Sequence, residues 1–428
     1  MSRVLIWNRI RPGSELDIFH PTDYSGLYDH VMTKWNGVCQ NWGNRLWFQG
    51  ICSALDTGEN TYDFLPDIID FDKINSEYDF IILSMANVFH SEYAKGMRAY
   101  AELFQHIQIP VYVIACGVQA DSYDTLQDVV SALRDDASRF ISSVYRTGGE
   151  FALRGHFTKE FFDQLGFHSA VVTGCPSLYQ FGPEFRVAQE HVDPAGLRPV
   201  FNGRIRNFSG LMAGFPTGVF MDQDEFIAPL FQPDYLAKPD LRFQMDFLGR
   251  YGTEAARFLA EDRIRMIADM NDWWNYLQNE GFNYAFGARI HGTIMSLLSG
   301  IPATIVVCDS RTREMAEFFD IPMYAASGNH RLSVEELQEQ YQRMDYTAFN
   351  AGFAERFHNY EKFLTDHNIV SHANTDNRFF RRDTSFRAEA IGNLDQTEFS
   401  TFADTLHRNE KLLKMALLLR RIRGRIPL

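Results

Sequence analysis

The segment from Tyr284 to Leu298 reads YAFGARIHGTIMSLL and contains the pattern that decides the fold. Its first three residues are apolar and aromatic, which favours a buried strand, and Thr293–Leu298 has the apolar spacing of a helix. A short turn between them holds Arg289, His291 and Gly292. A strand that turns directly into a helix is the building unit of a parallel α/β sheet.

The same alternation of apolar runs and helical stretches continues along the chain on both sides of this segment. In the first half, strands are predicted at Val4–Trp7, Phe80–Leu83, Val111–Ala115, Phe151–Leu153 and Ala170–Val172, and helices at Asn44–Ala54, Tyr93–His106, Thr125–Arg134 and Thr158–Leu165. In the second half, strands are predicted at Val200–Asn202, Val219–Met221, Arg242–Asp246, Tyr284–Phe286 and Thr304–Val307, and helices at Glu254–Gln278, Thr293–Leu298, Thr312–Phe319, Val334–Arg343 and Ala351–Asp366. Two successive α/β halves predict a cleft between them, with ligands at the carboxyl ends of the strands.

The length of the chain and its turn-rich middle indicate how it divides into domains. At 428 residues and 45% hydrophobic content, two domains with full cores are expected. We place them at residues 1–185 and 198–390, and a C-terminal helical segment at 391–428. The stretch Lys411–Arg425 is Leu-rich and strongly basic. It is either a terminal helix docked on the body with a solvated basic end, or an amphipathic anchor on an anionic membrane surface.

Composition excludes several classes of function. The formal net charge is -14, which disfavours nucleic-acid binding. The five cysteines are scattered without CxxC spacing, and HExxH is absent, so neither a disulfide framework nor a metal site is predicted. Walker A and GxGxxG loops are also absent, so no cofactor is expected. No apolar run suits a signal peptide or a membrane span, which predicts a cytoplasmic protein, optionally at the inner face of the membrane.

The turn after Tyr284–Phe286 has the chemistry of an anion site. The first N–H groups of a helix have no partner within the helix and lie at its positive end, where anions bind. Arg289 offers a planar fork for carboxylate or phosphate, and His291 can donate a proton near neutral pH. Gly292 permits close approach of the backbone, and Thr293 can cap the helix. A plain helix start with a surface arginine is the alternative interpretation.

Longer stretches around this turn resemble the polysaccharide pyruvyl transferase family. The resemblance is carried by Phe286–Pro302, with Asp309 and the run Phe318–Pro322 after it. It also covers the segments Asn41-Trp42-Gly43-Asn44, Phe151-Ala152-Leu153-Arg154 with Leu165-Gly166, and Gly174-Cys175-Pro176-Ser177. Two departures stand out: Ser84–Asn87 lies where many relatives have a Gly-rich turn, and Arg311 follows Asp309 where many relatives carry lysine.

The resemblance implies a glycosyltransferase-B-like fold of two Rossmann-like domains facing a cleft. It implies transfer of pyruvate from phosphoenolpyruvate to two hydroxyls of a sugar, in a surface polysaccharide or its lipid-linked precursor. The first domain would then hold the acceptor and the second domain phosphoenolpyruvate. Carried over residue by residue, Arg289 and His291 match the family's phosphoenolpyruvate-binding pair, and Arg154 matches a further basic residue facing the cleft. We add Gly292 and Thr293 to the donor site from the helix start, and Arg311 as the charge in place of the lysine. The turn of Asn41, Gly43 and Asn44 is the candidate contact with the acceptor.

Ketal formation from an enol phosphate needs an acid, a base and groups that stabilise charge on the phosphate. His291 suits the acid, and Asp121, which follows a predicted strand, is the candidate base. Glu150, His90 and Glu92 are further candidates that local turn and capping roles explain equally well. The acidic run Asp222–Glu225 is interpreted as a solvated loop.

Two other functions remain open from the sequence. The first is a nucleotide-sugar-dependent glycosyltransferase of the same fold, whose anion site would hold a diphosphate beside a base-stacking pocket. The second is a non-catalytic glycan-binding protein, which an Arg289–His291 pair buried in internal ion pairs without an open cleft would favour.

Overall fold

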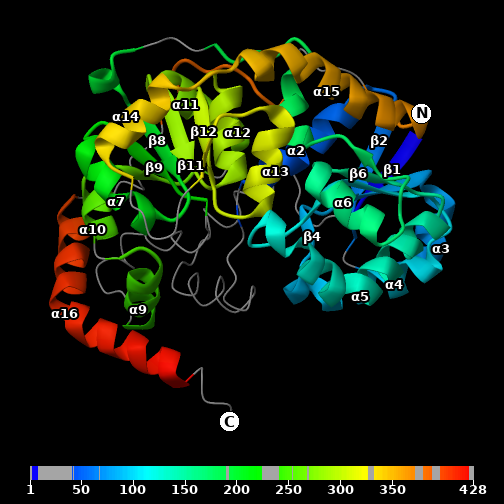
Figure 1. The fold of residues 1–428 in the computed structure, drawn as a ribbon, viewed down its shortest axis with the longest axis horizontal. Helices are drawn as coiled ribbons and strands as arrows, with labels where there is room; N and C mark the ends of the chain where they lie inside the picture. Colours follow the sequence, from blue (N-terminus) through cyan, green and yellow to red (C-terminus); the bar gives the residue numbers. More distant parts are fainter. Residues whose placement is uncertain are drawn as a thin grey trace.

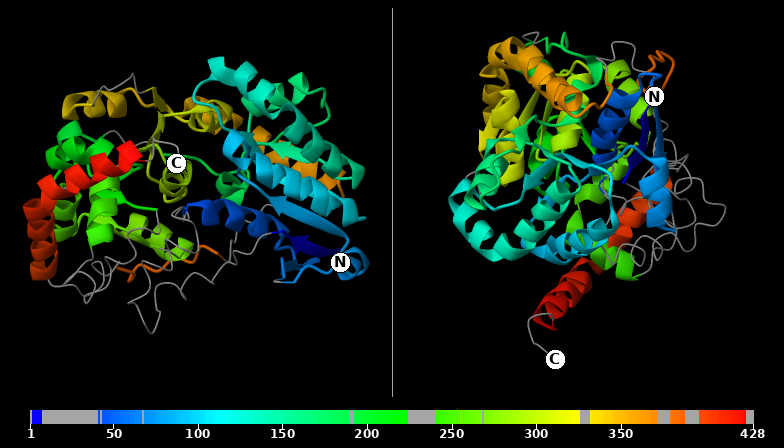
Figure 2. Two further views of the ribbon diagram at one scale, coloured as in Figure 1. Left: turned by 90° about the horizontal axis from the view of Figure 1, so that it is seen from below. Right: turned by 90° about the vertical axis from the view of Figure 1, so that its right-hand side faces the viewer.

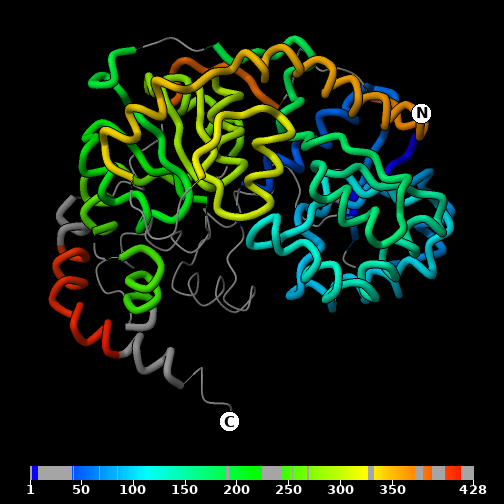
Figure 3. Tube along the Cα trace, viewed as in Figure 1, coloured from blue at the N-terminus to red at the C-terminus, as the bar shows by residue number. Residues whose placement is uncertain are grey.

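The computed structural model contains two α/β lobes side by side (Figure 1). It describes residues 2–7, 41, 43–66, 68–188, 192–223, 241–252, 254–267, 269–325, 332–371, 379–387 and 396–423. The tube in Figure 3 traces the chain from the first lobe, in blue and cyan, to the second, in green and yellow.

The first lobe is built on a parallel sheet. Its strands are β1 (Ser2–Ile6), β2 (Asn60–Phe64), β3 (Phe80–Ser84), β4 (Asn87–Phe89), β5 (Val111–Val118), β6 (Phe151–Leu153) and β7 (Val171–Val172). Their order is β2-β1-β3-β5-β6-β7, with β4 paired to β5. Its helices are α2 (Asn44–Leu55), α3 (Phe71–Glu77), α4 (Ala94–Leu103), α5 (Leu126–Arg146) and α6 (His156–Gln164).

The second lobe contains a second parallel sheet. Its strands are β8 (Pro199–Asn202), β9 (Val219–Met221), β10 (Ile264–Arg265), β11 (Tyr284–Gly287), β12 (Ala303–Val307) and β13 (Met323–Ala325), in the order β10-β9-β8-β11-β12-β13. The helices that follow are α7 (Ile205–Gly214), α9 (Leu241–Arg250), α10 (Glu254–Ala260), α11 (Met270–Asn279), α12 (Ile290–Leu298), α13 (Ser310–Phe319), α14 (Val334–Gln342), α15 (Thr347–Asp366) and α16 (Gln396–Arg423). The predicted fold class, two parallel α/β domains, is confirmed.

Side chains of the strands alternate between two cores. Leu5 packs with the helices on one face of the first sheet, whereas Val4 and Ile6 face a core that continues into the second lobe. All of the predicted strands in the first half are present within a few residues. Both sheets lie within the predicted ranges 1–185 and 198–390; the domain limits themselves stay a prediction.

Two secondary-structure predictions in the second half are wrong. Arg242–Asp246 alternates in polarity like a strand but lies in α9, because Phe243 and Phe247, one helical turn apart, both pack on Phe402 of α16. Glu254–Gln278 is not one helix. The chain leaves α10, passes through Asp262 with a positive φ of 56°, and adds β10 to the sheet before α11 begins.

Helix α15 spans the two lobes along the top of Figure 1. Its residue Phe363 and the following His367 contact Tyr112 of β5 in the first lobe. Helix α16 packs against α9 and α10 at the other side of the second lobe, as the labels of Figure 1 show. Figure 2 shows this helix in red from two further sides. No helix in the part of the chain that the structure describes is long and apolar enough to cross a membrane.

The first turns of α13 join the two lobes through buried hydrogen bonds. Ser310 exchanges hydrogen bonds with the backbone of Ala120 and donates its hydroxyl to the carbonyl of Val118, just past the end of β5. Glu314, 2% exposed, accepts from the backbone N–H and the hydroxyl of Thr158 at 2.6 and 3.0 Å, and so caps α6 from the other domain. Burial raises the pKa of Glu314 to about 7, against the opposing effect of the Thr158 hydrogen bonds and the Arg154 charge.

We predict that Glu314 makes the stability of the protein depend on pH. Its folded pKa of about 7 lies above the ordinary 4.5, so the folded state binds more protons between these values. The stabilisation is complete below pH 4.5 and is lost as pH rises through 7; it amounts to about 3 kcal/mol at 1.36 kcal/mol per pKa unit. In urea unfolding measured against pH, Glu314→Gln should remove this fall, while Glu317→Gln, an exposed neighbour on α13, should keep it. Parallel curves for wild type and Glu314→Gln would contradict the assignment.

Candidate functional site

A cavity of about 420 Å³ opens between the two domains. It lies where strands of both sheets end, since its walls follow the carboxyl ends of β5, β6, β8, β11 and β12. The lining residues are Asn41, Asn44, Ala86, Asn87, Gln119, Asp121, Arg154, Gly203, Arg204, Asn207, Ala288, Arg289, Ile290, His291, Cys308, Asp309, Arg311 and Thr312. The volume is within the range of about 300–1,000 Å³ that is usual for small-molecule sites.

Four helices begin at this cavity. Helices α2, α7 and α12 have Gly43, Arg204 and Arg289 as N-cap residues, and none of these caps makes a side-chain hydrogen bond to its helix. Only α13 is capped from within, by the carboxylate of Asp309, which accepts from the Thr312 N–H at 3.1 Å. Three uncapped helix N-termini aimed at one cavity give it a positive potential suited to an anion.

Asn202, at the end of β8, sets the turn into α12. Its carbonyl accepts from the N–H of Ala288, and its side-chain oxygen accepts from the N–H of Arg289 at 2.9 Å. These bonds start the helix at Ile290, three residues earlier than predicted. The first-turn amides are therefore those of residues 290–292.

The structure corrects the predicted role of Thr293. Its amide already donates to the carbonyl of Arg289 at 3.1 Å, and its side chain is fully buried, so it neither caps the helix nor reaches the cavity. Gly292 also lies behind the cavity wall. A Cβ there would meet the side chain of Gln223 at 2.3 Å, so the missing side chain makes room for Gln223 and not directly for a ligand.

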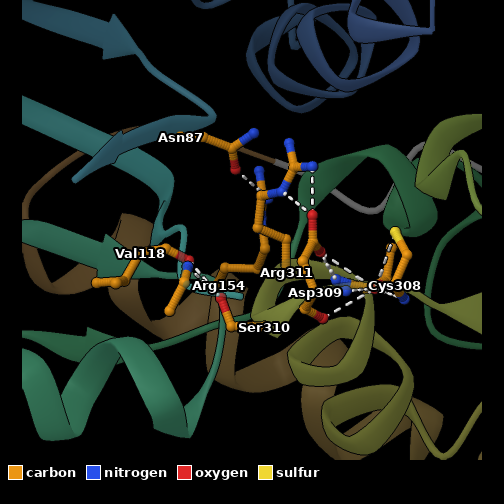
Figure 4. A network of polar contacts seen from close by, with 9 residues as sticks. Asn87, Val118, Arg154, Cys308, Asp309, Ser310 and Arg311 are labelled. Atoms are coloured by element: carbon orange, nitrogen blue, oxygen red, sulfur yellow. Dashed lines mark hydrogen bonds and ion pairs between the residues drawn. The ribbon is translucent and has the colours of Figure 1, made fainter. Parts of the chain in front are cut away.

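Arg154 enters the cavity from the end of β6 and is 2% exposed. It donates to Oδ1 of Asn87 at 2.8 Å (Figure 4). It also donates to the carbonyl of Ala115 at 3.3 Å. Ala115 lies at a bulge in β5 with a φ of 59°, a strained conformation for a residue other than glycine. No carboxylate among the described residues forms an ion pair with Arg154, and its Nε has no hydrogen-bond partner there. Its charge acts on the buried carboxyl of Glu314, but the hydrogen bonds of that carboxyl go to Thr158. A buried cation that forms no ion pair is costly unless a ligand supplies the counter-charge.

His291 is buried beside this cation, with 6% exposure. Burial, and then the nearby Arg154 charge, lower the pKa of His291 to about 3. Its Nε2 has no hydrogen-bond partner among the described residues. The imidazole is therefore neutral at pH 7, and it requires a bound anion to become the proton donor that the sequence predicts.

Arg311 lies on the α13 side of the cavity, where Figure 4 shows its guanidinium folded back onto Asp309. Its Nε donates to the Asp309 carboxylate at 2.9 Å, so part of its charge is already neutralised. Asp121 is exposed at the rim on the first-domain side. Glu150, the other carboxylate considered as a base, precedes β6 and lies at the opposite end of that strand from Arg154. Neither it nor His90 nor Glu92 lines the cavity.

The turn before α2 contributes the wall from the first domain. Asn41 accepts from the N–H of Gly43 through its side chain and from the N–H of Asn44 through its carbonyl, which forms a tight turn. Asn41 and Asn44 line the cavity, whereas Gly43 is buried against Gln223 and His291. The structure thus brings seven predicted site residues to one cavity: Asn41, Asn44, Asp121, Arg154, Arg289, His291 and Arg311.

Sequence reasoning missed several residues at the site. Arg204 follows β8 and Gly203 just as Arg289 follows β11, so the repeated strand-turn-arginine-helix pattern could have revealed it. Asn87 accepts a hydrogen bond from Arg154, and Asn202 accepts one from the N–H of Arg289. No sequence motif predicts either bond. The acidic run was also misread: Asp222 and Gln223 are buried at the end of β9, while residues 224–225 lie outside the described residues.

Two parallel α/β domains, with an arginine-lined cavity where the carboxyl ends of their strands meet, define the structural class of the protein. A family model described as polysaccharide pyruvyl transferase matches residues 53–310, more than half of the chain. The chain belongs to the polysaccharide pyruvyl transferase family. Membership assigns it a pyruvyl-transfer role in polysaccharide biosynthesis.

Curated proteins and solved structures add little to this family match. No curated protein matches the chain. Solved structures with a similar trace include a functionally uncharacterized protein from Klebsiella pneumoniae (14% identity, 67% of this chain and 90% of that chain, TM-score 0.36). Others are S. aureus MnaA in complex with UDP (10%, 96% and 97%, 0.34) and the glycosyltransferase SnogD from Streptomyces nogalater (12%, 85% and 95%, 0.28). At such low TM-scores these likenesses say nothing about the site.

We predict that Arg204 contributes to anion binding and that Arg206 does not. Both are exposed near the start of α7, but only Arg204 lines the cavity, while Arg206 donates to the carbonyl of Gly249. Arg204→Met should weaken binding of inorganic phosphate about tenfold, the effect of losing one charged hydrogen bond. Thermal shift titrations of the two methionine variants measure this. Equal affinities for both would remove Arg204 from the site.

Proposed function

We propose that the protein transfers pyruvate from phosphoenolpyruvate to two hydroxyls of one sugar, forming a pyruvate ketal and releasing phosphate. The sugar belongs to a surface polysaccharide or to its lipid-linked precursor. The observation that carries this proposal is Arg154, a buried cation without a carboxylate partner among the described residues, at the floor of a cavity lined by helix N-termini.

The charges of the cavity fit a donor with two anionic groups. Among the described lining residues, four are arginines, Arg154, Arg204, Arg289 and Arg311, and two are carboxylates, Asp121 and Asp309. Phosphoenolpyruvate carries a carboxylate and a phosphate, the two kinds of group that a guanidinium binds best. Arg289 and the first turn of α12 then face the phosphate, because charge builds on this group as it leaves.

The alternative functions have less support from the cavity. No Phe, Tyr or Trp is among its described lining residues, although a nucleotide-sugar site needs a surface on which a base stacks. Arg289 and His291 face an open cavity, and a glycan-binding scaffold does not require cationic residues gathered in this way. Both observations favour pyruvyl transfer from a small donor.

The reaction balances with no other reactant. The first sugar hydroxyl bonds to the central carbon of phosphoenolpyruvate, and a proton adds to its CH2 carbon, which becomes the methyl group. The C–O bond to phosphate then breaks, and the second hydroxyl bonds to the same carbon and closes the ring. Of the two hydroxyl protons, one corresponds to the proton gained by the methyl group and the other leaves with phosphate.

His291 suits the acid in this scheme once the donor is bound. Burial is the main cause of the depressed pKa of His291, and the Arg154 charge is the second. An anionic donor offsets the second cause, so its binding raises this pKa. Asp121 lies on the acceptor side and is the carboxylate that we assign as the base. The Asn41–Asn44 turn offers amide groups to the sugar from the same side.

Incubation with phosphoenolpyruvate and a panel of sugar acceptors tests the function. We expect phosphate release coupled to a gain of mass on the glycan. His291→Ala and Arg289→Ala should each lower turnover by about 10²–10³-fold, since each removes stabilisation of charge in the transition state. Their unfolding free energies should stay close to that of the wild type. Activity retained in either variant would exclude that residue, and stabilisation by a nucleotide sugar without phosphate release would reject the function.

We further propose that α16 brings the enzyme to an anionic membrane, where a lipid-linked acceptor is found. Leu412 and Met415 are 67% and 60% exposed on this helix, beside Lys411 and Lys414, while Leu413 packs inward. Exposed apolar side chains flanked by lysines suit the interface of an anionic bilayer. The more strongly basic residues 420–425 have no described side chains.

Vesicle binding tests this localisation. Leu412→Glu combined with Met415→Glu should lower co-sedimentation with phosphatidylglycerol-containing vesicles and leave turnover on a soluble acceptor unchanged. The substitutions are preferable to a truncation, because removing the end of α16 would also remove the buried Leu413. Equal sedimentation of the variant and the wild type would count against membrane attachment.

A further inference from the structure

Gln223 is a buried polar residue behind the wall of the cavity, and the catalytic scheme does not use it. It follows β9 at the carboxyl end of the second sheet, the edge at which the other site residues lie. Its side chain is 1% exposed, and neither Oε1 nor Nε2 has a hydrogen-bond partner among the described residues. Almost every buried amide in a folded protein has a partner, so this carboxamide requires an explanation.

Two glycines, one from each domain, fix the place of this side chain. A Cβ on Gly43 would lie 2.3 Å from Oε1 of Gln223 and 2.9 Å from Cβ of His291. A Cβ on Gly292 would lie 2.3 Å from Nε2 of Gln223. The carboxamide therefore lies between the first turns of α2 and α12, with its oxygen toward α2 and its nitrogen toward α12.

The neighbours of Gln223 are also short of partners. Nε2 of His291 and Nε of Arg154 are buried without a hydrogen bond to any described residue. His291 connects the set, because it lies against Gly43 beside Gln223 and experiences the charge of Arg154. Unsatisfied polar atoms gathered at the converging ends of two helices indicate a site that is completed by a ligand.

We propose that Gln223 is a positioning residue for His291, and that its carboxamide holds the first turns of α2 and α12 at the distance at which they bind the anion. This inference rests on the proposed function, in which His291 is the catalytic acid. A carboxamide suits this place because it is neutral and has both a donor and an acceptor. Methionine would fill the same volume but could form no hydrogen bond once the anion is bound, and glutamate would place a negative charge beside His291, next to the cavity.

Kinetics with phosphoenolpyruvate separate positioning from simple packing. Gln223→Met should lower kcat about 10²-fold with little change in the KM for the sugar, the effect of a displaced catalytic group. Gln223→Glu should instead raise the KM for phosphoenolpyruvate at least about tenfold, through repulsion between anions. The matched control is Gln244→Met, since Gln244 is a buried glutamine of α9 that bonds Asn409 of α16, away from the cavity. It should change stability and leave kcat and KM unaltered.

A second measurement does not depend on the identity of the donor. Inorganic phosphate should stabilise the wild type and Gln244→Met against heat, and Gln223→Glu should weaken this binding at least about tenfold. If the wild type binds phosphate but does not turn over phosphoenolpyruvate, the proposed function fails while the role of Gln223 in anion binding still stands.

A pair of substitutions tests the placement of the side chain itself. Gly292→Ala should destabilise the protein, because its Cβ meets Gln223. The double variant with Gln223→Ala should lose less unfolding free energy than the two single variants lose together, since the contact is then relieved. Additive losses, unchanged phosphate affinity in Gln223→Glu, or a kcat within twofold of wild type in Gln223→Met would each overturn the inference.

Discussion

The contact between α13 and the end of β5 is the interaction on which the cavity depends. Ser310 and Glu314 belong to the second domain, and both are hydrogen-bonded to backbone groups of the first. The bonds are buried, so water does not compete for them. Since Arg154 follows β6 and Arg289 begins α12, only this alignment of the domains places their charges on the same cavity. The site is a property of the pair of domains, and neither domain contains it alone.

Parallel sheets explain why so many helix N-termini meet at this cavity. All strands of a parallel sheet have their carboxyl ends on the same side, and the helix that follows each strand begins there. Two sheets with these edges facing each other therefore bring several positive helix ends together. Most of this potential is kept: Asp309 neutralises the end of α13, while the ends of α2, α7 and α12 have no side-chain cap.

The sequence predicted the parts of this arrangement that depend on local pattern. The strand-turn-helix unit around Arg289 and the alternation on either side of it follow from hydrophobic periodicity, and they led to the correct fold class. The helix α9 was missed because the side that Phe243 and Phe247 share is buried only by contact with Phe402. That residue lies far along the chain, so a short window of sequence does not reveal the contact. Thr293 was misplaced as a cap because the true start of α12 is set by Asn202, on another strand. Gln223 was interpreted as solvated because its acidic neighbours dominate a short window.

Helix α15 gives this architecture a consequence for recombination. It belongs to the second half of the chain, yet Phe363 and His367 cover Tyr112 on the first sheet. Exchange of the first domain between family members at the connection before β8 would therefore separate that sheet from the helix that covers it. A working chimera has to inherit α15 together with the first domain, so the unit of exchange is discontinuous along the chain.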